Sequence, residues 1–119
     1  MSGRALLLAL CAFVADISAA EFPAVGNDLI RWCAPTASRA DKQTCHIYLD
    51  ALLGVHMWRV EKLREGATPL WCFPQNITLD ELGLVVHRHI YGLKPDVQKQ
   101  WALPTVEAAF MRNFPCPSK

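Results

Sequence analysis

The sequence predicts an all-α fold, a small disulfide-stapled bundle of about four helices. Apolar residues recur at helical spacing in four separate segments, and no alternation of apolar and polar residues runs far enough to predict a strand. Four cysteines follow an N-terminal targeting segment, an even number that is typical of a disulfide framework in a small exported protein. Together these observations favour a short helical chain held by two disulfides.

The targeting segment covers residues 1–20 and has the layout of a secretory signal peptide. Arg4 supplies a positive charge, residues 5–14 form an uninterrupted apolar stretch, and small residues follow at 18–20. The apolar stretch is too short to span a bilayer comfortably. We therefore expect residues 1–20 to be removed, residues 21–119 to form one helical domain, and the exported chain to lack a membrane segment after cleavage.

The charge balance excludes one class of partners. The chain carries 12 Lys and Arg against 11 Asp and Glu, which gives a formal net charge of +1. Nucleic-acid binding favours a basic stripe. The local basic residues Arg59, Lys62 and Arg64 are interrupted by Glu61 and Glu65. We expect no nucleic-acid partner.

The first expected helix is short and the second is long. Residues 28–33 form a short apolar helix that Pro35 ends. The long helix has Asp41 as its expected N-cap and ends near Gly66. Because it is apolar on two opposite sides, we expect it to be enclosed in the core. The two sides carry Cys45, Tyr48, Leu49, Leu52 and Val55, and Ile47, Ala51, Gly54 and Trp58.

The third expected helix starts at a capping box. Thr78 is the expected N-cap, and Glu81 reaches back to the Thr78 amide. Gly92 and Pro95 mark the end of the helix. Residues 76–78 also form a glycosylation sequon, but capping explains Thr78 more simply. The apolar stripe of this helix consists of Leu82, Val85, Val86, His89 and Leu93.

The last expected helix follows a short helical turn between Pro95 and Pro104. Val97 and Trp101 are the apolar residues of that turn, and Pro104 suits the first position of the helix that follows. Phe114-Pro115-Cys116 then closes the fold and attaches the last helix to an earlier segment. The apolar face of this helix consists of Val106, Ala109, Phe110 and Phe114.

The mature chain is expected to form two disulfides from Cys33, Cys45, Cys72 and Cys116. A metal site is disfavoured because no C-x-x-C or H-E-x-x-H spacing occurs. A nucleophilic Cys72 would need a free, activated thiolate beside a base. All three pairings are open. A straight helix from Cys45 to Arg64 rises about 28 Å. For Cys72 to reach Cys45, the eight residues after Arg64 must run back along the helix in a nearly extended conformation. Pairing cysteines that are consecutive in the sequence, Cys33–Cys45 and Cys72–Cys116, requires the intervening chain to span a shorter distance.

The sequence contains no recognisable catalytic set. Paired carboxylates in an apolar setting, a nucleophile elbow and a glycine-rich phosphate loop are all missing, so we expect no enzymatic activity and no cofactor. Most of the four tryptophans should be core or subunit contacts. Trp71, in a loop beside Cys72, is expected to be the most exposed of them. His89 is expected to be a core or interface side chain, and His87 to face solvent.

Four fragments carry a family resemblance: CHIYLDALLG (45–54), WCFPQNITLDEL (71–82), VVHRHIYGLKP (85–95) and AAFMRNFPC (108–116). They resemble the Rap/Tai family of bacterial immunity proteins, whose pattern is C-x-x-Y-[ILV]-x-[AG]-x-x-G, then F-C-x-P before a helix, then F-P-C. The resemblance covers nearly the whole mature chain. The matching positions are Cys45, Tyr48, Leu49, Ala51, Gly54, Cys72, Pro74, Phe114, Pro115 and Cys116.

The resemblance implies an all-helical periplasmic domain, commonly a homodimer. Relatives of this kind bind and block peptidoglycan amidases that type VI secretion systems deliver, by occluding the cleft of a papain-like hydrolase. The implied mechanism is stoichiometric inhibition of an amidase effector. The motif residues, including Tyr48, Leu49, Gly54, Pro74, Phe114 and Pro115, are implied to be structural.

A second resemblance, to small periplasmic acid-stress chaperones, bears on the disulfides and on function. It favours Cys45–Cys72 with Cys33–Cys116, because in those chaperones a cysteine before one helix bonds another that heads a later helix. It also supplies the alternative function, a periplasmic chaperone that opens at low pH.

Family motifs do not identify the residues that contact a partner. We therefore choose candidate contact residues by their position in the predicted fold. The polar link at residues 61–71 joins charge, glycine and an aromatic ring and is long enough to enter a cleft. A second candidate is the segment at residues 94–101. The partner-binding residues expected in the first link are Glu61, Arg64, Glu65 and Trp71.

Overall fold

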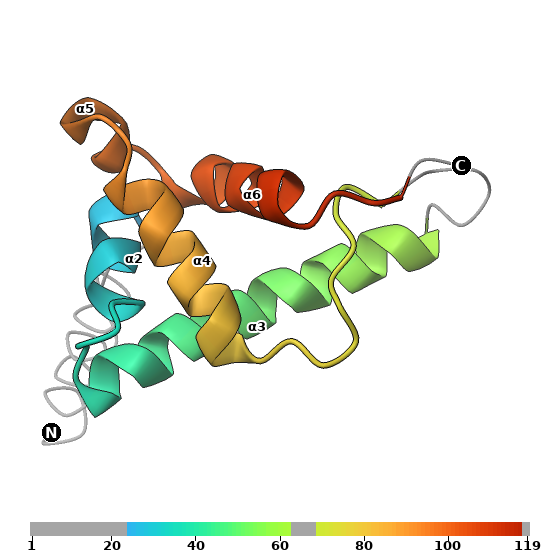
Figure 1. The fold of residues 1–119 in the computed structure, drawn as a ribbon, viewed down its shortest axis with the longest axis horizontal. Coiled ribbons are helices and arrows are strands. Elements are labelled where there is room, and N and C mark those ends of the chain that lie inside the picture. The colour runs from blue at the N-terminus through green and yellow to red at the C-terminus, as the bar shows by residue number, and fades with distance from the viewer. Residues whose placement is uncertain (1–23, 63–68, 118–119) are drawn as a thin grey trace, which may run out of the picture.

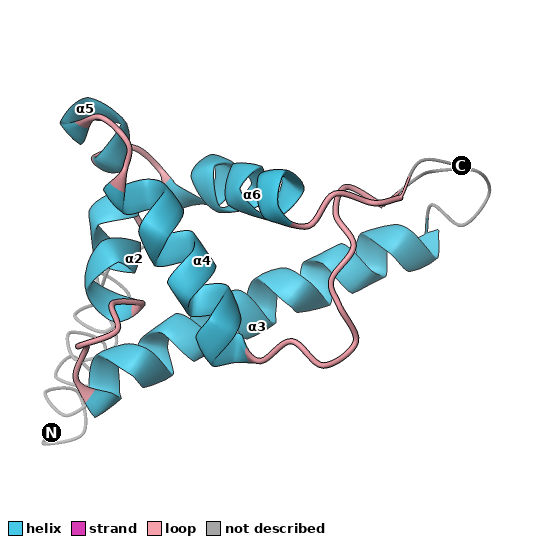
Figure 2. Cartoon of the chain, in the orientation of Figure 1, coloured by secondary structure: helices cyan, strands magenta, loops and turns pink. Residues whose placement is uncertain are grey.

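The structure, a computed structural model, describes residues 24–62 and 69–117. Five helices occupy 68% of these residues: α2 (Gly26–Trp32), α3 (Arg39–Lys62), α4 (Leu79–Tyr91), the short α5 (Pro95–Gln98) and α6 (Ala102–Asn113) (Figures 1 and 2). The described part contains no strand, which confirms the predicted all-α, disulfide-stapled fold. None of its helices is both long and apolar enough to cross a membrane. The expected signal peptide, residues 1–20, lies outside the described residues.

The centre of the fold is α4. This helix crosses α3 and packs against α2, α3 and α6 (Figure 1). Side chains from all four helices, and from the segment that leads into α4, meet in one core. Its largest fully buried members are Trp71, Phe110, Leu29, Leu49, Leu82, Ile90, Val86 and Val106.

The expectation that α3 is enclosed on both sides is wrong. Only Cys45 and Leu49 of α3 are buried, whereas Ile47 and Trp58 on its other side are 63% and 60% exposed. With 24 residues, α3 rises about 36 Å, so its C-terminal half extends beyond the crossing with α4 (Figure 1). The small domain has too few helices to cover that length on two sides.

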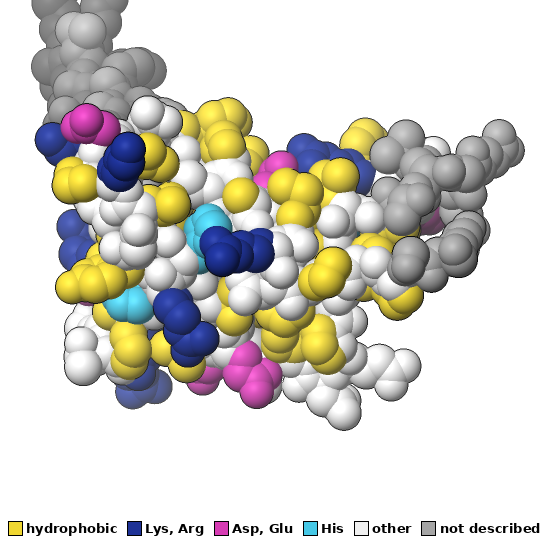
Figure 3. Space-filling model, turned by 45° about the horizontal axis from the view of Figure 1, so that its top comes forward, with side chains coloured by type: hydrophobic (Ala, Val, Ile, Leu, Met, Phe, Trp, Pro, Cys, Tyr) yellow, Lys and Arg dark blue, Asp and Glu magenta, His cyan; other side chains and the backbone are white. Residues whose placement is uncertain are grey.

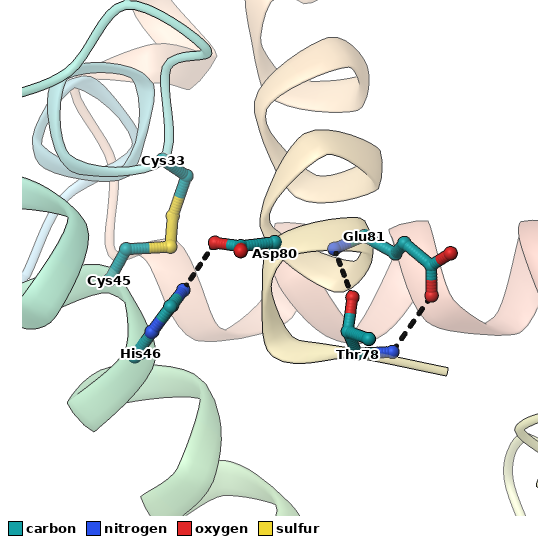
Figure 4. A network of polar contacts seen from close by, with 6 residues as sticks. All are labelled: Cys33, Cys45, His46, Thr78, Asp80 and Glu81. Atoms are coloured by element: carbon teal, nitrogen blue, oxygen red, sulfur yellow. Dashed lines mark hydrogen bonds and ion pairs between the residues drawn. A yellow bond between two sulfur atoms is a disulfide. The ribbon is translucent and has the colours of Figure 1, made fainter. Parts of the chain in front are cut away.

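Side-chain caps set where α3 and α4 begin. At α4 the Glu81 N–H donates to Thr78 Oγ1 (3.1 Å) and the Thr78 N–H donates to the Glu81 carboxylate (2.8 Å), so the predicted capping box is present (Figure 4). The cap of α3 is Ser38 instead of Asp41, because the Asp41 N–H donates to Ser38 Oγ (3.1 Å). The helix therefore begins three residues earlier than the sequence suggested.

The C-terminal part follows the expected order, with α5 as the short turn and α6 as the last helix. The start of α6 is Ala102, so Pro104 occupies the third helical position, where its missing N–H leaves no helical bond unmade. Two backbone bonds attach the α5–α6 link to the start of α2: Gly26 N–H to Gln100 O (3.0 Å) and Ala102 N–H to Ala24 O (2.9 Å).

The buried face of α4 is rotated from the predicted stripe. Val85 and His89, which were predicted on that stripe, are only half-buried. The rotation places Gly83 against the Cys33–Cys45 disulfide, where a Cβ atom would lie 3.1 Å from Cys45 Sγ. Glycine allows this close approach because it has no side chain. The buried residues of α4 are Leu82, Gly83, Val86 and Ile90.

We expect Gly83→Ala to lower the free energy of unfolding by about 1–3 kcal/mol, because the added methyl group overpacks the contact with the buried disulfide. Gly92→Ala is the matched control at the C-cap of the same helix, since Gly92 has a φ of −80° and its Cβ would meet Arg88 O at 3.6 Å. The control should stay within about 1 kcal/mol of the parent protein. Urea unfolding measures both, and equal stability of the two variants would contradict the tight packing at Gly83.

The two disulfides join Cys33 to Cys45 and Cys72 to Cys116. The favoured pairing, Cys45–Cys72 with Cys33–Cys116, is therefore wrong. The short connection from α2 to α3 brings the Cα atoms of Cys33 and Cys45 within 5.3 Å. Cys72 lies near the start of the segment at residues 69–78 that leads back to α4, here called the return segment. Its N–H donates to the Phe114 carbonyl (2.8 Å) beside the end of α6. The neighbour there is Cys116, with a Cα–Cα distance of 4.8 Å.

A polar contact links α3 and α4 next to the first disulfide. His46 Nε2 lies 2.7 Å from Asp80 Oδ1, and Figure 4 shows this pair between the disulfide and the capping box. The Asp80 side chain is largely exposed, so solvent screens the pair and its contribution to stability is small.

Candidate functional site

The C-terminal half of α3 exposes several large apolar side chains: Val55, Met57, Trp58 and Val60. Met57 is 70% exposed and Trp58 is 60% exposed. Single exposed apolar residues are ordinary on soluble proteins, but a group on one helix indicates a binding surface. Val55 and Trp58 come from the two apolar sides of α3 that the sequence analysis placed in the core, so both sides reach solvent in this half of the helix.

A groove of about 770 Å³ lies beside this part of α3. One wall is α3 itself and the other is the segment that returns towards α4, drawn in yellow in Figure 1. The surface of the groove is mostly apolar, with one carboxylate, Glu61, at its edge. The lining residues are Gly54, His56, Met57, Trp58, Val60, Glu61, Pro69, Trp71 and Phe73. We call this the α3 groove.

Trp71 joins the α3 groove to the core. Its side chain is only 2% exposed, so the expectation that it is the most exposed tryptophan is wrong; Trp58 and Trp101 are the exposed ones. The Trp71 ring stacks on His56, with centroids 4.1 Å apart, and lies 5.4 Å from the Phe110 ring. The neighbouring disulfide at Cys72 holds this segment against α6, which turns the indole inward.

An aromatic cluster continues from Trp71 to the C-terminal end of the fold. Phe73 lies 5.1 Å from Phe110 and 5.0 Å from Phe114, centroid to centroid, and both contacts are edge-on. Edge-on aromatic pairs add stability beyond the area that they bury. The return segment is thus fixed by this cluster and by the Cys72–Cys116 disulfide.

His56 is the titratable group under the α3 groove. Its Nδ1 and the Trp71 Nε1 are buried and have no hydrogen-bond partner among the described residues. Burial lowers the pKa of His56, and the charge of Arg59 lowers it further, whereas the Trp71 backbone and Glu107 act in the opposite direction. Arg59 and Glu107 pair with each other across α3 and α6 at 3.4 Å. His56 is therefore neutral at pH 7.

The lowered pKa of His56 predicts that the fold loses stability in mild acid. The unfolded chain takes up a proton near pH 6.5, but the folded chain does so only at lower pH, so stability falls as the pH drops below about 6.5. His56→Phe keeps the stacked ring and removes the titration. Urea unfolding at pH 7.5 and 5.5 should show a smaller loss for this variant than for the parent protein. Identical losses would contradict a lowered pKa of His56 in the folded chain.

The structure brings two of the predicted partner-binding residues into one groove. Glu61 is exposed at the edge of the α3 groove and Trp71 is buried at its base. Arg64 and Glu65 lie outside the described residues. The second predicted segment, residues 94–101, lies near α2 and away from the groove (Figure 1).

The residues of the family-like motifs occupy different environments. Leu49 is buried, and Tyr48 and Phe114 are half-buried against the core. Gly54, Pro74 and Pro115 are exposed, and a Cβ at Gly54 would meet nothing within 4 Å. Gly54 therefore has no packing role within the described residues of one chain.

Sequence reasoning did not identify Met57, Trp58 and Val60 as site residues. Trp58 was on the second apolar side of the long helix, but that side was assigned to the core; Met57 and Val60 were on neither of the two predicted apolar sides. In the described part of the chain, no group of three His, Cys, Asp or Glu side chains is arranged to hold a metal ion.

Comparison with known proteins gives one match. The family described as Rap1a immunity proteins matches the chain over residues 25–116, a range that includes α2 to α6, both disulfides and the α3 groove. Searches of curated proteins and of solved structures found no match. Because the family match spans well over half of the chain, this protein belongs to the family of Rap1a immunity proteins.

Proposed function

We propose that this protein is a periplasmic immunity protein that binds a type VI secretion peptidoglycan amidase and inhibits it by occluding its active-site cleft. Membership of the Rap1a immunity family carries the proposal. The two disulfides support an oxidising compartment such as the periplasm. In this proposal the protein acts by stoichiometric binding, without turnover and without a cofactor.

The shape and chemistry of α3 support its use as the inhibitory element. Its C-terminal half extends beyond the crossing with α4, and a single helix with side chains is only about 10–12 Å wide, which is narrow enough to enter a cleft. Exposed Met57 and Val60 supply apolar anchors, and Glu61 supplies a polar edge. An apolar centre with a polar rim is the usual composition of a protein interface.

The test is calorimetric titration of the oxidised mature chain, residues 21–119, into a papain-like amidase encoded beside it, with cell-wall hydrolysis assayed in parallel. We expect saturable binding and loss of hydrolysis. Met57→Asp should weaken binding by about 30-fold, the loss typical of one interface anchor. Met111→Asp is the matched control, since Met111 on α6 is also exposed but lies outside both the α3 groove and α3 itself. Full hydrolysis in the presence of the unaltered protein would overturn the proposal for that amidase.

We also propose that the protein forms a homodimer through the outer stripe of α3. This stripe consists of Ile47, Ala51, Gly54 and Trp58, and all four are exposed in a single chain. In an antiparallel two-fold pairing of α3, Ile47 of one copy faces Trp58 of the other, and Ala51 faces Gly54. Such self-complementarity suits an isologous contact, and the small central pair permits close helix packing.

Sedimentation analysis tests the homodimer. The unaltered protein should sediment as a dimer at tens of micromolar, and Ile47→Asp should convert it to a monomer because a carboxylate is costly in an apolar contact. Met57→Asp, outside the outer stripe, should remain dimeric. A monomeric parent protein would contradict the homodimer without affecting the amidase proposal.

A further inference from the structure

A second pocket lies between α4 and α6 and shares no lining residue with the α3 groove. It has a volume of about 350 Å³, and three of its lining side chains are basic. Arg88 and His89 come from the last turns of α4, and Arg112 comes from the last turn of α6. No carboxylate lines it. The lining residues are Val85, Arg88, His89, Gly92, Leu93, Arg112 and Asn113.

The positive charge of this pocket is not neutralised by the described residues. The ion pairs of the described part involve Arg31, Arg59 and His46, and neither Arg88 nor Arg112 takes part in one. On the face shown in Figure 3, Lys and Arg side chains lie next to His side chains. Two guanidinium groups from different helices therefore flank one pocket without a counter-charge.

The pKa of His89 also reflects the positive charge of this pocket. Burial lowers the pKa of His89, and the charge of Arg112 lowers it further. The imidazole is therefore neutral at pH 7, although a negative group placed in the pocket would favour its protonated form. An anion would thus gain from both arginines and, in mild acid, from a third cation.

We propose that the pocket between α4 and α6 binds a carboxylate, presented as an Asp or Glu side chain by a protein partner. A guanidinium group presents parallel N–H donors that match the two oxygens of a carboxylate. Val85 and Leu93 supply apolar surface for the methylene groups of such a side chain. The volume is at the lower end of the range for ligand pockets, which suits a single side chain. The identity of the partner as the amidase rests on the proposed function; the binding site does not.

The experiment follows the His89 ring resonances of the oxidised mature chain by NMR. The probe is N-acetylglutamate α-amide, which carries the side-chain carboxylate, and the matched control probe is N-acetylglutamine α-amide, which has the same shape without the charge. We expect a saturable shift and a raised His89 pKa with the first probe only. Arg112→Gln should weaken binding of N-acetylglutamate α-amide by about tenfold or more. Arg31→Gln, on α2 and paired with Asp28, should leave it unchanged.

Three results would overturn the carboxylate site. They are equal shifts with both probes, a shift that sodium chloride reproduces at the same ionic strength, and tighter binding of inorganic phosphate than of the carboxylate probe. No amidase is present in this experiment, so its failure leaves the proposed function standing. Conversely, failure of the amidase titration leaves the pocket open to a different acidic partner.

Discussion

Removal of the Cys72–Cys116 disulfide, by combining Cys72→Ala with Cys116→Ala, is expected to lower the free energy of unfolding by about 4 kcal/mol. The two cysteines are 44 residues apart in sequence, and a cross-link of that span restricts the unfolded chain by about this amount. The native state also loses an anchor, because this disulfide holds the return segment against the end of α6. Urea unfolding of the oxidised proteins measures the loss.

The matched variant removes the other disulfide, Cys33–Cys45, whose cysteines are 12 residues apart. Its chain-entropy contribution is smaller, about 3 kcal/mol. Limited proteolysis separates the two variants by location. Loss of Cys72–Cys116 should open residues 69–73 to cleavage, whereas loss of Cys33–Cys45 should leave them protected. Unfolding of the Cys72–Cys116 variant at the same urea concentration as the parent protein would contradict the role assigned to this bond.

Trp71→Ala is the second large effect that we expect, a loss of about 3–5 kcal/mol of stability. Trp71 is 2% exposed and contacts His56 on α3 and Phe110 on α6, so its removal leaves a large cavity between the two helices. The C-terminal half of α3 has few other contacts with the body of the fold. Its helical order should therefore decrease more than that of α4.

Trp101→Ala is the control for Trp71→Ala. Trp101 is 52% exposed, so truncation removes far less buried surface than at Trp71 and should cost about 1–2 kcal/mol. Thermal unfolding gives the two stabilities, and hydrogen exchange of α3 gives the local effect. A Trp71→Ala protein as stable as the Trp101→Ala protein would contradict the assignment of Trp71 to the core.

Local signals in the sequence were sufficient for most of the helical elements. The capping box at Thr78 and Glu81 depends on residues three apart, and it is present as predicted. The apolar face of the last helix also follows from local periodicity, since Val106, Ala109 and Phe110 are buried. The start of α3 was misplaced because Ser38 and Asp41 are both good caps, and local propensity does not decide between them.

Features that depend on distant contacts were not predictable in the same way. The burial of Trp71 follows from the Cys72–Cys116 pairing, which sequence alone left among three possibilities. The rotation of α4 follows from the contact of Gly83 with the other disulfide. In both of these cases the deciding neighbour was far away in the chain.

The candidate site illustrates a further limit of sequence patterns. Charge and an aromatic ring in the link predicted Glu61 and Trp71, which the structure does place at the α3 groove. The pattern of apolar residues on α3, by contrast, is the same for a helix enclosed in a core and for a helix that binds a partner. Only the arrangement of the other helices shows that Met57 and Val60 face solvent.

The most direct test of the central claim is inhibition of the neighbouring amidase by the oxidised mature chain with and without Met57→Asp. We predict that the unaltered protein and Met111→Asp abolish peptidoglycan hydrolysis near one protein per enzyme, and that Met57→Asp does so only at about 30-fold higher concentration. Equal inhibition by all three proteins would contradict the α3 groove as the inhibitory surface. Absence of inhibition by the unaltered protein would contradict its assignment as the inhibitor of that enzyme.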